Sequence, residues 1–170
     1  MTAITSINLL FLMPVYGISQ GMQTIIAYNY GAKQFDRAKK ALSIGILGAA
    51  GILSFGLIAI LLFPKQFISI FTKDARLMEL ALNGISIYSL TLPAIGICIL
   101  GTVYFQSIGS AKKSIVLSLL RQVIVFIPLI LIVPKYFGLN GVWDAQPLAD
   151  IVSMIIIGLF LIKEFKDCKL

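Results

Sequence analysis

The stretch GISQGMQTIIAYNYGAKQFDRAKKAL, from Gly17 to Leu42, decides the fold because it changes within a few residues from apolar to strongly basic. Its first half has no charged side chain but carries two glutamines, Gln20 and Gln23. An aromatic and glycine-containing corner, YNYGA, follows, and four Lys and Arg side chains come after it. This pattern predicts a membrane-spanning helix that ends at a basic connection outside the hydrocarbon.

The composition of the rest of the chain agrees with this prediction. Hydrophobic residues make up 59% of the 170 residues, charged residues make up 12%, and the mean hydropathy is +0.99. Soluble domains carry about 25% charged residues. A spanning helix needs roughly 20 apolar residues, and charge is absent from four long segments, namely Met1 to Ala32, Ala41 to Pro64, Leu80 to Ala111, and Gln122 to Pro134. We therefore predict an all-α, polytopic transmembrane helix bundle.

The apolar runs predict five spans in a single transmembrane domain that covers residues 1–170. Their approximate bounds are 6–28, 41–63, 81–104, 114–133 and 147–161. The glycine-containing segments YNYGAKQFD and QSIGSAKKS are expected to be sharp turns. Pro64 and Pro134 are expected to end helices, because proline cannot continue the backbone hydrogen-bond ladder. Alternation of apolar and polar residues from Phe67 to Phe71 predicts a short interfacial helix between spans two and three.

The distribution of Lys and Arg predicts the orientation of the bundle. Nine lie in the first connection, the third connection and the C-terminal tail, against four in the other connections. This places the C-terminus in the cytoplasm and Met1 outside, as expected of a multi-pass plasma-membrane protein. Topology also accounts for the net charge of +7, so nucleic-acid binding loses its main support. The uncharged start lacks the basic region of a signal peptide, and both an interior start and a true five-span protein remain open.

Residue usage argues against an enzyme or a metal site. The chain has no histidine and two cysteines, which excludes the usual zinc sites and histidine-based nucleophilic catalysis. Cys98 lies within a predicted span and Cys168 in the tail, so no disulfide is expected. Asp150 is the only carboxylate that the predicted spans immerse. We therefore expect neither catalysis nor a cofactor.

Two charged residues inside spans are candidate functional groups. Arg121 lies eight residues beyond Lys113, ~12 Å further along the helix; its side chain either snorkels to the headgroups or faces a polar pathway. Asp150 lies six residues past Asp144, ~9 Å into the last span. It either carries a proton or cation or lies in a vestibule open to water. A direct pair between Arg121 and Asp150 is not expected, because the two start from opposite sides of the bilayer.

Uncharged polar residues supply further candidates. Gln20 and Gln23 are three residues apart and share a helix face, where amides either join neighbouring helices or line a polar cavity. Tyr88 and Tyr104 bracket the third span, as residues of the interfacial aromatic belt do. Tyr88 lies further inside, where an aromatic face beside amides suits an organic cation.

Two long strings carry a resemblance to a known family: MPVYGISQGMQTIIAYNYGAKQFDRAKKAL and YFQSIGSAKKSIVLSLLRQVIVFIPLILIVPKYFGLNGVWDAQPLAD. With their spacing, they resemble the multidrug and toxic compound extrusion (MATE) family, in particular its bacterial drug/sodium-type antiporters. The resemblance covers nearly the whole chain. Thr24 and Ala27 stand where relatives typically have Pro and Gly, and Asp144 and Gln146 where apolar residues are expected.

The resemblance implies a fold and a function. Members have two six-helix lobes around a central cavity, and this chain matches the second lobe from its second helix to its sixth. They export organic cations or drugs in exchange for H⁺ or Na⁺, by alternating access and without a cofactor. The missing N-terminal lobe, in cis or in trans, is then a partner. The expected cavity residues are Gln20, Gln23, Tyr88 and Gln106, with Arg121 as an electrostatic element and Asp150 as a further candidate.

Two other functions fit the hydropathy. A non-transporting remnant, or a structural subunit of a split transporter, agrees with the missing lobe. A lipid-linked sugar flippase agrees with the span pattern but not with the matched strings. If the chain is part of a two-lobe transporter, we expect it not to export drugs alone, because a site between two lobes needs both walls.

Overall fold

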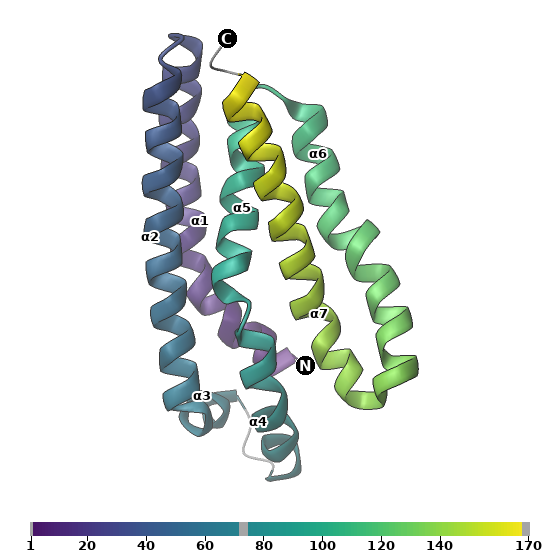
Figure 1. The fold of residues 1–170 in the computed structure, drawn as a ribbon. Coiled ribbons are helices and arrows are strands. Elements are labelled where there is room, and N and C mark those ends of the chain that lie inside the picture. The colour runs from purple at the N-terminus through teal and green to yellow at the C-terminus, as the bar shows by residue number, and fades with distance from the viewer. Residues whose placement is uncertain (1, 72–74, 168–170) are drawn as a thin grey trace.

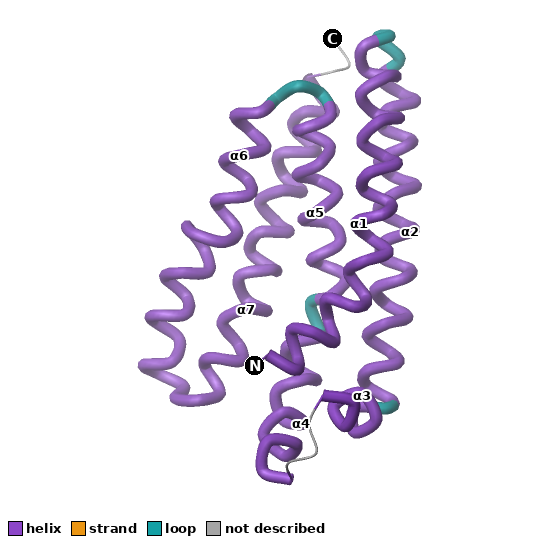
Figure 2. Tube along the Cα trace, turned by 180° about the vertical axis from the view of Figure 1, so that it is seen from behind, coloured by secondary structure: helices purple, strands orange, loops and turns teal. Residues whose placement is uncertain are grey.

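The stretch from Gly17 to Leu42 forms one end of a helical hairpin in the computed structural model, which describes residues 2–71 and 75–167. Helix α1 (Thr2–Gly31) packs along α2 (Phe35–Leu62), and Figures 1 and 2 show the two side by side over much of their length. Pro14 lies inside α1, which both views show to bend between its ends. An internal proline removes one backbone hydrogen bond and is a common cause of such bends.

Both predicted glycine-containing turns are sharp Schellman-type helix ends. In the first, the Gln34 N–H donates to the Asn29 carbonyl at 2.8 Å. Lys33, with φ of 59°, occupies the left-handed position that glycine usually holds. In the second, Gly109 takes that position with φ of 75°, and the Ser110 N–H makes the equivalent bond at 3.0 Å. Glycine is thus needed conformationally at the second turn only.

The remaining elements complete an all-helical bundle. They are α3 (Pro64–Phe71), α4 (Ala75–Ser89), α5 (Leu92–Ser107), α6 (Ala111–Leu119), the π-helical segment η1 (Leu120–Val125) and α7 (Phe126–Asp167). Five segments are long and apolar enough to cross a membrane, which confirms the predicted all-α, five-span fold. These segments are Ile4–Gly31, Phe35–Leu62, Gly84–Ser107, Ala111–Lys135 and Ala145–Lys166.

The third span is discontinuous. The sequence predicted one helix over residues 81–104, but α4 ends at Ser89 and α5 begins at Leu92. Pro93 is the second residue of α5 and has no N–H to donate to the Ser89 carbonyl, so the ladder cannot continue across this point. Ser89 and Thr91, on either side of the break, are buried in the bundle, whereas Leu90 between them is 61% exposed. Irregular backbone is tolerated at membrane depth where protein covers it.

The fourth span contains a π-helical turn from Leu120 to Val125. The Phe126 N–H bonds back five residues to the Arg121 carbonyl, which is the π pattern. Pro128 follows closely, and its ring would clash with the Ile124 carbonyl in a regular α-helix. Local π geometry is one way in which transmembrane helices accommodate proline.

The last two spans are joined by a helical reversal. Figure 1 shows the chain turning back on itself within α7, between the span that ends at Lys135 and the span that begins at Ala145. The prediction that Pro134 ends a helix is wrong, since Pro134 lies inside α7. Gly141 is required at this reversal: a Cβ there would come within 2.7 Å of the Val133 carbonyl oxygen. Pro64, by contrast, follows the end of α2 and opens α3.

The core is built around α5, which lies between the α1–α2 hairpin and the α6–α7 pair in Figures 1 and 2 and contacts all four helices. More than half of its span is buried inside the bundle, the largest share of the five. Close approach depends on small residues, as is usual between membrane helices. A Cβ on Gly96 of α5 would lie 2.7 Å from Leu53 of α2.

Tyr104 belongs to this core and not to an aromatic belt. Its side chain is only 1% exposed. The ring makes edge-to-face contacts with Phe105 and Phe165 at centroid distances of 5.6 and 5.7 Å. The interfacial interpretation of Tyr104 is therefore wrong, because bundle packing, which hydropathy does not report, covers this residue on all sides.

Candidate functional site: a buried ion pair between two cavities

Arg121 and Asp150 form an ion pair inside the bundle. The Arg121 Nε–H donates to Asp150 Oδ1 at 2.9 Å. The Asp150 side chain is fully buried and that of Arg121 is 24% exposed. The expectation that these two residues do not pair is wrong, and so are the interpretations of Asp150 as a vestibule residue open to water and of Arg121 as a snorkelling side chain.

The geometry explains why the pair forms. Arg121 lies ten residues from Ala111 at one end of its span, or ~15 Å, and Asp150 lies five residues from Ala145 at the opposite end of the next, or ~8 Å. In a hydrocarbon layer of ~30 Å, their backbones then differ in depth by less than ~10 Å. The long arginine side chain crosses this gap. The sequence-based expectation compared only the positions of the two residues along their helices and did not include the length of the arginine side chain.

The Asp150 carboxylate is only half satisfied. Gln146 donates through Nε2 to the same oxygen, Oδ1, at 3.4 Å. The other oxygen, Oδ2, is buried and has no hydrogen-bond partner, and the same is true of the Ser153 hydroxyl one helical turn away. Buried polar atoms normally have partners, so this carboxylate oxygen is open to one more hydrogen bond.

Two cavities of about 300 Å³ each meet at Arg121. The first, which we call the Gln106 cavity, is lined by Gln106, Thr102 and Cys98 of α5, by Ser118 of α6, and by Arg121. The second, the Tyr88 cavity, is lined by Tyr88 of α4, Ile95 of α5, Asn8 of α1, Gln146 of α7 and, again, Arg121.

The two cavities follow one another along the third span. The Tyr88 cavity takes its residues from Tyr88 to Ile95, and the Gln106 cavity from Cys98 to Gln106. Arg121 is common to both and therefore lies at the level where one gives way to the other. Its pairing with Asp150 fixes the guanidinium at that level.

Four of the six predicted site residues are thus brought together around one ion pair. Tyr88 and Gln106 line the cavities, one on each side of Arg121, and Asp150 holds Arg121 in place. Gln20 and Gln23 lie apart from this cluster on α1: Gln20 is exposed, Gln23 is half-buried, and neither lines the Tyr88 or the Gln106 cavity.

Sequence reasoning missed several residues of the site. Gln146 and Asp150 are four residues apart on a helix, a spacing that brings side chains together, so this contact was accessible from the sequence. The Ser89 hydroxyl donates to Asn8 Oδ1 at 3.0 Å across 81 residues, and the Cys98 thiol to the Asp150 backbone oxygen at 3.8 Å. Neither long-range contact has a local sequence signal.

A second ion pair lies nearer the end of the bundle. Lys113 of α6 and Glu164 of α7 are 2.5 Å apart, with side chains 45% and 11% exposed. This pair joins α6 to the last turn of α7 but is open to solvent on the lysine side. No group of three or more His, Cys, Asp or Glu side chains capable of holding a metal occurs in the part of the chain that the structure describes. Cys98 is a buried free thiol, and Cys168 lies outside the described residues.

Five apolar spans with a buried ion pair between them and two cavities beside that pair define a polytopic helical membrane protein with an internal charged site. The family model described as MatE matches residues 1–132, and the chain belongs to this family of transporters. The family resemblance stated for the sequence is thereby confirmed.

Individual relatives agree with this placement. The multidrug export protein MepA of Staphylococcus aureus is 27% identical over 147 residues, which are 84% of this chain and 32% of the relative. MepA of Staphylococcus saprophyticus is 26% identical over the same length. The chain therefore spans about a third of the length of the curated relatives it matches.

Solved structures match almost the whole chain. The MATE multidrug transporter DinF-BH, solved as a complex with a ligand, is 36% identical and superposes with a TM-score of 0.87 over 96% of this chain and 37% of that one. An outward-facing MATE transporter superposes with a TM-score of 0.93 over 99% of this chain and 38% of its own, at 22% identity. The latter likeness concerns the fold.

Proposed function

We propose that this chain forms most of the second lobe of a MATE-type multidrug efflux antiporter, which exports organic cations or drugs in exchange for H⁺ or Na⁺. The observation that carries the proposal is the Arg121–Asp150 pair between the Tyr88 and Gln106 cavities. Membership of the MatE family, the multidrug export activity named for the MepA relatives and the ligand complex of the multidrug transporter DinF-BH support it.

The site suits alternating access, in which a pathway opens to one side of the membrane at a time. A buried ion pair at the junction of two cavities closes the route between them, because separating the charges in a low-dielectric interior is costly. The unpartnered Asp150 Oδ2 accepts a proton or helps bind Na⁺. Either event weakens the hold of Asp150 on Arg121. Tyr88 and Gln106 then present an aromatic face and an amide to a cationic solute.

The missing lobe is the proposed partner, supplied in cis or in trans. Gln20 is an exposed amide on a helix whose outward-facing side chains are mostly apolar. An amide left against lipid costs about 2 kcal/mol or more, which is avoided if this face of α1 meets the other lobe across a polar cavity. Nine basic residues against four support a C-terminus in the cytoplasm.

The proposal is tested in an intact transporter in which this chain replaces the corresponding part of Staphylococcus aureus MepA. Asp150→Asn and Arg121→Met are expected to lower ethidium efflux at least tenfold at equal membrane abundance. The matched control is Glu164→Gln, which breaks the solvent-open pair with Lys113 and should leave efflux nearly unchanged. Efflux that survives both site variants at full rate would overturn the role of the pair.

A second arm separates a transporter part from a non-transporting subunit. The chimera is compared with this chain coexpressed with the missing helices as a separate chain, in cells that lack their own efflux pumps. Resistance to ethidium in both settings supports a transport lobe that works in cis or in trans. Failure of the chimera to export any cation, although it is present in the membrane at verified abundance, would favour a structural role for this chain.

A further inference from the structure

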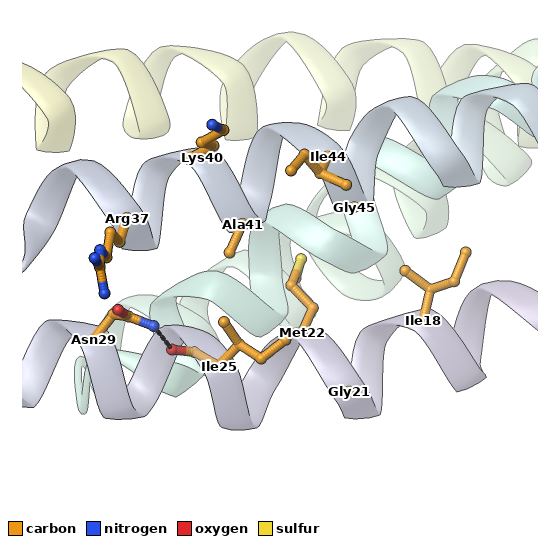
Figure 3. Close-up of a pocket in the computed structure, with 10 residues that line it drawn as sticks. All are labelled: Ile18, Gly21, Met22, Ile25, Asn29, Arg37, Lys40, Ala41, Ile44 and Gly45. Atoms are coloured by element: carbon orange, nitrogen blue, oxygen red, sulfur yellow. Dashed lines mark hydrogen bonds between the residues drawn. The ribbon is translucent and has the colours of Figure 1, made fainter.

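A groove of about 600 Å³ opens on the outer surface between α1 and α2, away from the ion pair. Five residues of α1 line it, at helical spacings of three and four: Ile18, Gly21, Met22, Ile25 and Asn29. Figure 3 shows their side chains along one edge of α1, facing α2. The groove exists because Gly21 has no side chain, and a Cβ there would meet nothing within 4 Å.

The opposite wall of the groove comes from the start of α2. It consists of Arg37, Lys40, Ala41, Ile44 and Gly45, again one face of a helix. Met22 of α1 packs directly against Gly45 of α2 and forms the floor of the groove with it. A Cβ on Gly45 would prevent this contact, because it would come within 2.6 Å of the Met22 sulfur. The floor is buried, whereas the rims are open: Ile25 is 52% exposed and Ile44 is 60% exposed.

Charge and apolar surface are separated along the groove. Arg37 and Asn29 lie together at one end, with Lys40 one turn further along α2, while Ile18 marks the other end (Figure 3). The Asn29 amide donates to the Ile25 carbonyl at 2.8 Å and so is held at that end. Neither Arg37 nor Lys40 has an ion pair within the described part of the chain. Neighbouring Lys39 is engaged elsewhere, with the Phe165 carbonyl at 3.1 Å.

The dimensions of the groove match one leaflet of a bilayer. Its α1 wall runs from Ile18 to Asn29, eleven residues or ~16 Å along the helix. Half of a hydrocarbon core of ~30 Å is ~15 Å. Arg37 and Lys40 lie in the first two turns of the second span, where the chain enters the membrane from the α1–α2 turn. The basic end is therefore at headgroup level and the apolar end is near the bilayer centre.

From this arrangement we infer that the groove binds one anionic phospholipid, with an acyl chain along the apolar wall and the phosphate between Arg37 and Lys40. Basic pockets between transmembrane helices at the headgroup level are typical sites for such lipids, and an arginine recognises phosphate through two parallel hydrogen bonds. Asp36 is the one acidic residue of this connection and does not line the groove. The site is separate from the proposed transport pathway, and its occupancy does not depend on transport.

The test uses the purified chain in detergent micelles, with native mass spectrometry to count the lipids that it retains. Phosphatidylglycerol is titrated against phosphatidylcholine, and inorganic phosphate alone distinguishes a lipid site from a phosphate site. One phosphatidylglycerol should be retained preferentially. Arg37→Gln combined with Lys40→Gln should weaken its retention about thirtyfold, the effect expected for two basic residues at a membrane surface. The matched control, Lys33→Gln combined with Lys112→Gln, removes two exposed charges outside the groove and should change retention less than threefold.

A second pair of variants tests the apolar part and does not alter charge. Gly21→Leu fills the groove, whereas Gly17→Leu places the same side chain one turn away on α1, where a Cβ is equally unobstructed. Gly21→Leu alone should abolish retention of phosphatidylglycerol. Equal retention of both lipids by the parent chain would overturn the inference. So would unchanged retention in Gly21→Leu or competition by phosphate alone.

Discussion

Replacing both members of the Arg121–Asp150 pair should disturb the fold less than replacing either one. Removing one partner of a buried pair typically costs 3–5 kcal/mol, because the other charge is left uncompensated, whereas replacing both with apolar residues is often neutral. Asp150 is fully buried, so Arg121→Met should lower the free energy of unfolding by about 3 kcal/mol. Asp150→Leu should cost somewhat less, since Arg121 is 24% exposed and its side chain can reach towards water.

The assay is a double-mutant cycle on the purified chain, unfolded with dodecyl sulfate in mixed micelles and followed by circular dichroism. The double variant Arg121→Met with Asp150→Leu should be within about 1 kcal/mol of the parent, which gives a coupling energy of several kcal/mol. The same cycle at Lys113 and Glu164, where the lysine is 45% exposed, should give less than about 1 kcal/mol. Additive effects of the two single substitutions at the buried site would refute the pairing.

Three other outcomes are expected. In a cysteine-free background, a cysteine placed at Lys112 should be shielded from an impermeant thiol reagent in intact cells, whereas one placed at Lys65 should be labelled; the reverse pattern would contradict the proposed orientation. Gly56→Ala should lower the free energy of unfolding by about 1–3 kcal/mol, because the added Cβ would come within 2.6 Å of the Phe11 ring. The control Gly51→Ala on the same helix adds a Cβ that meets nothing within 4 Å, and it should leave the free energy of unfolding unchanged. Expressed alone in pump-deficient cells, the chain should leave ethidium resistance unchanged, and gradient-dependent ethidium efflux by the purified chain in liposomes would show that one lobe suffices.

The number of spans and their class were predictable because they depend on the length and composition of apolar runs. The interruptions inside the spans were less so. Pro93 lies within the predicted third span, but a proline inside a span is equally compatible with a kink and with the complete break observed after Ser89. Pro134 was expected to end a helix, but the helical backbone continues through it and reverses further on.

The site was predictable residue by residue but not as an arrangement. Arg121 and Asp150 stood out because charge is rare inside a span. Their pairing depends on the relative depth of two neighbouring helices and on the reach of one side chain, neither of which a single sequence encodes locally. Contacts across long separations, such as that between Asn8 and Ser89, arise only when the helices pack. The exposure of Gln20 has the same origin, because which face of α1 turns outward is set by its neighbours.

The π-helical turn at Leu120 to Val125 affects how far the spacing of residues can be trusted in this span. Such a turn holds one residue more than an α-helical turn would, so a helical wheel drawn across it at a constant ~100° per residue misassigns the faces on one side. Deleting a single residue from this segment would let it close as a regular α-helical turn and leave the helix on either side on nearly the same faces. The extra residue is thus absorbed within one turn, and Arg121, which lies inside that turn, is among the few residues whose direction depends on it.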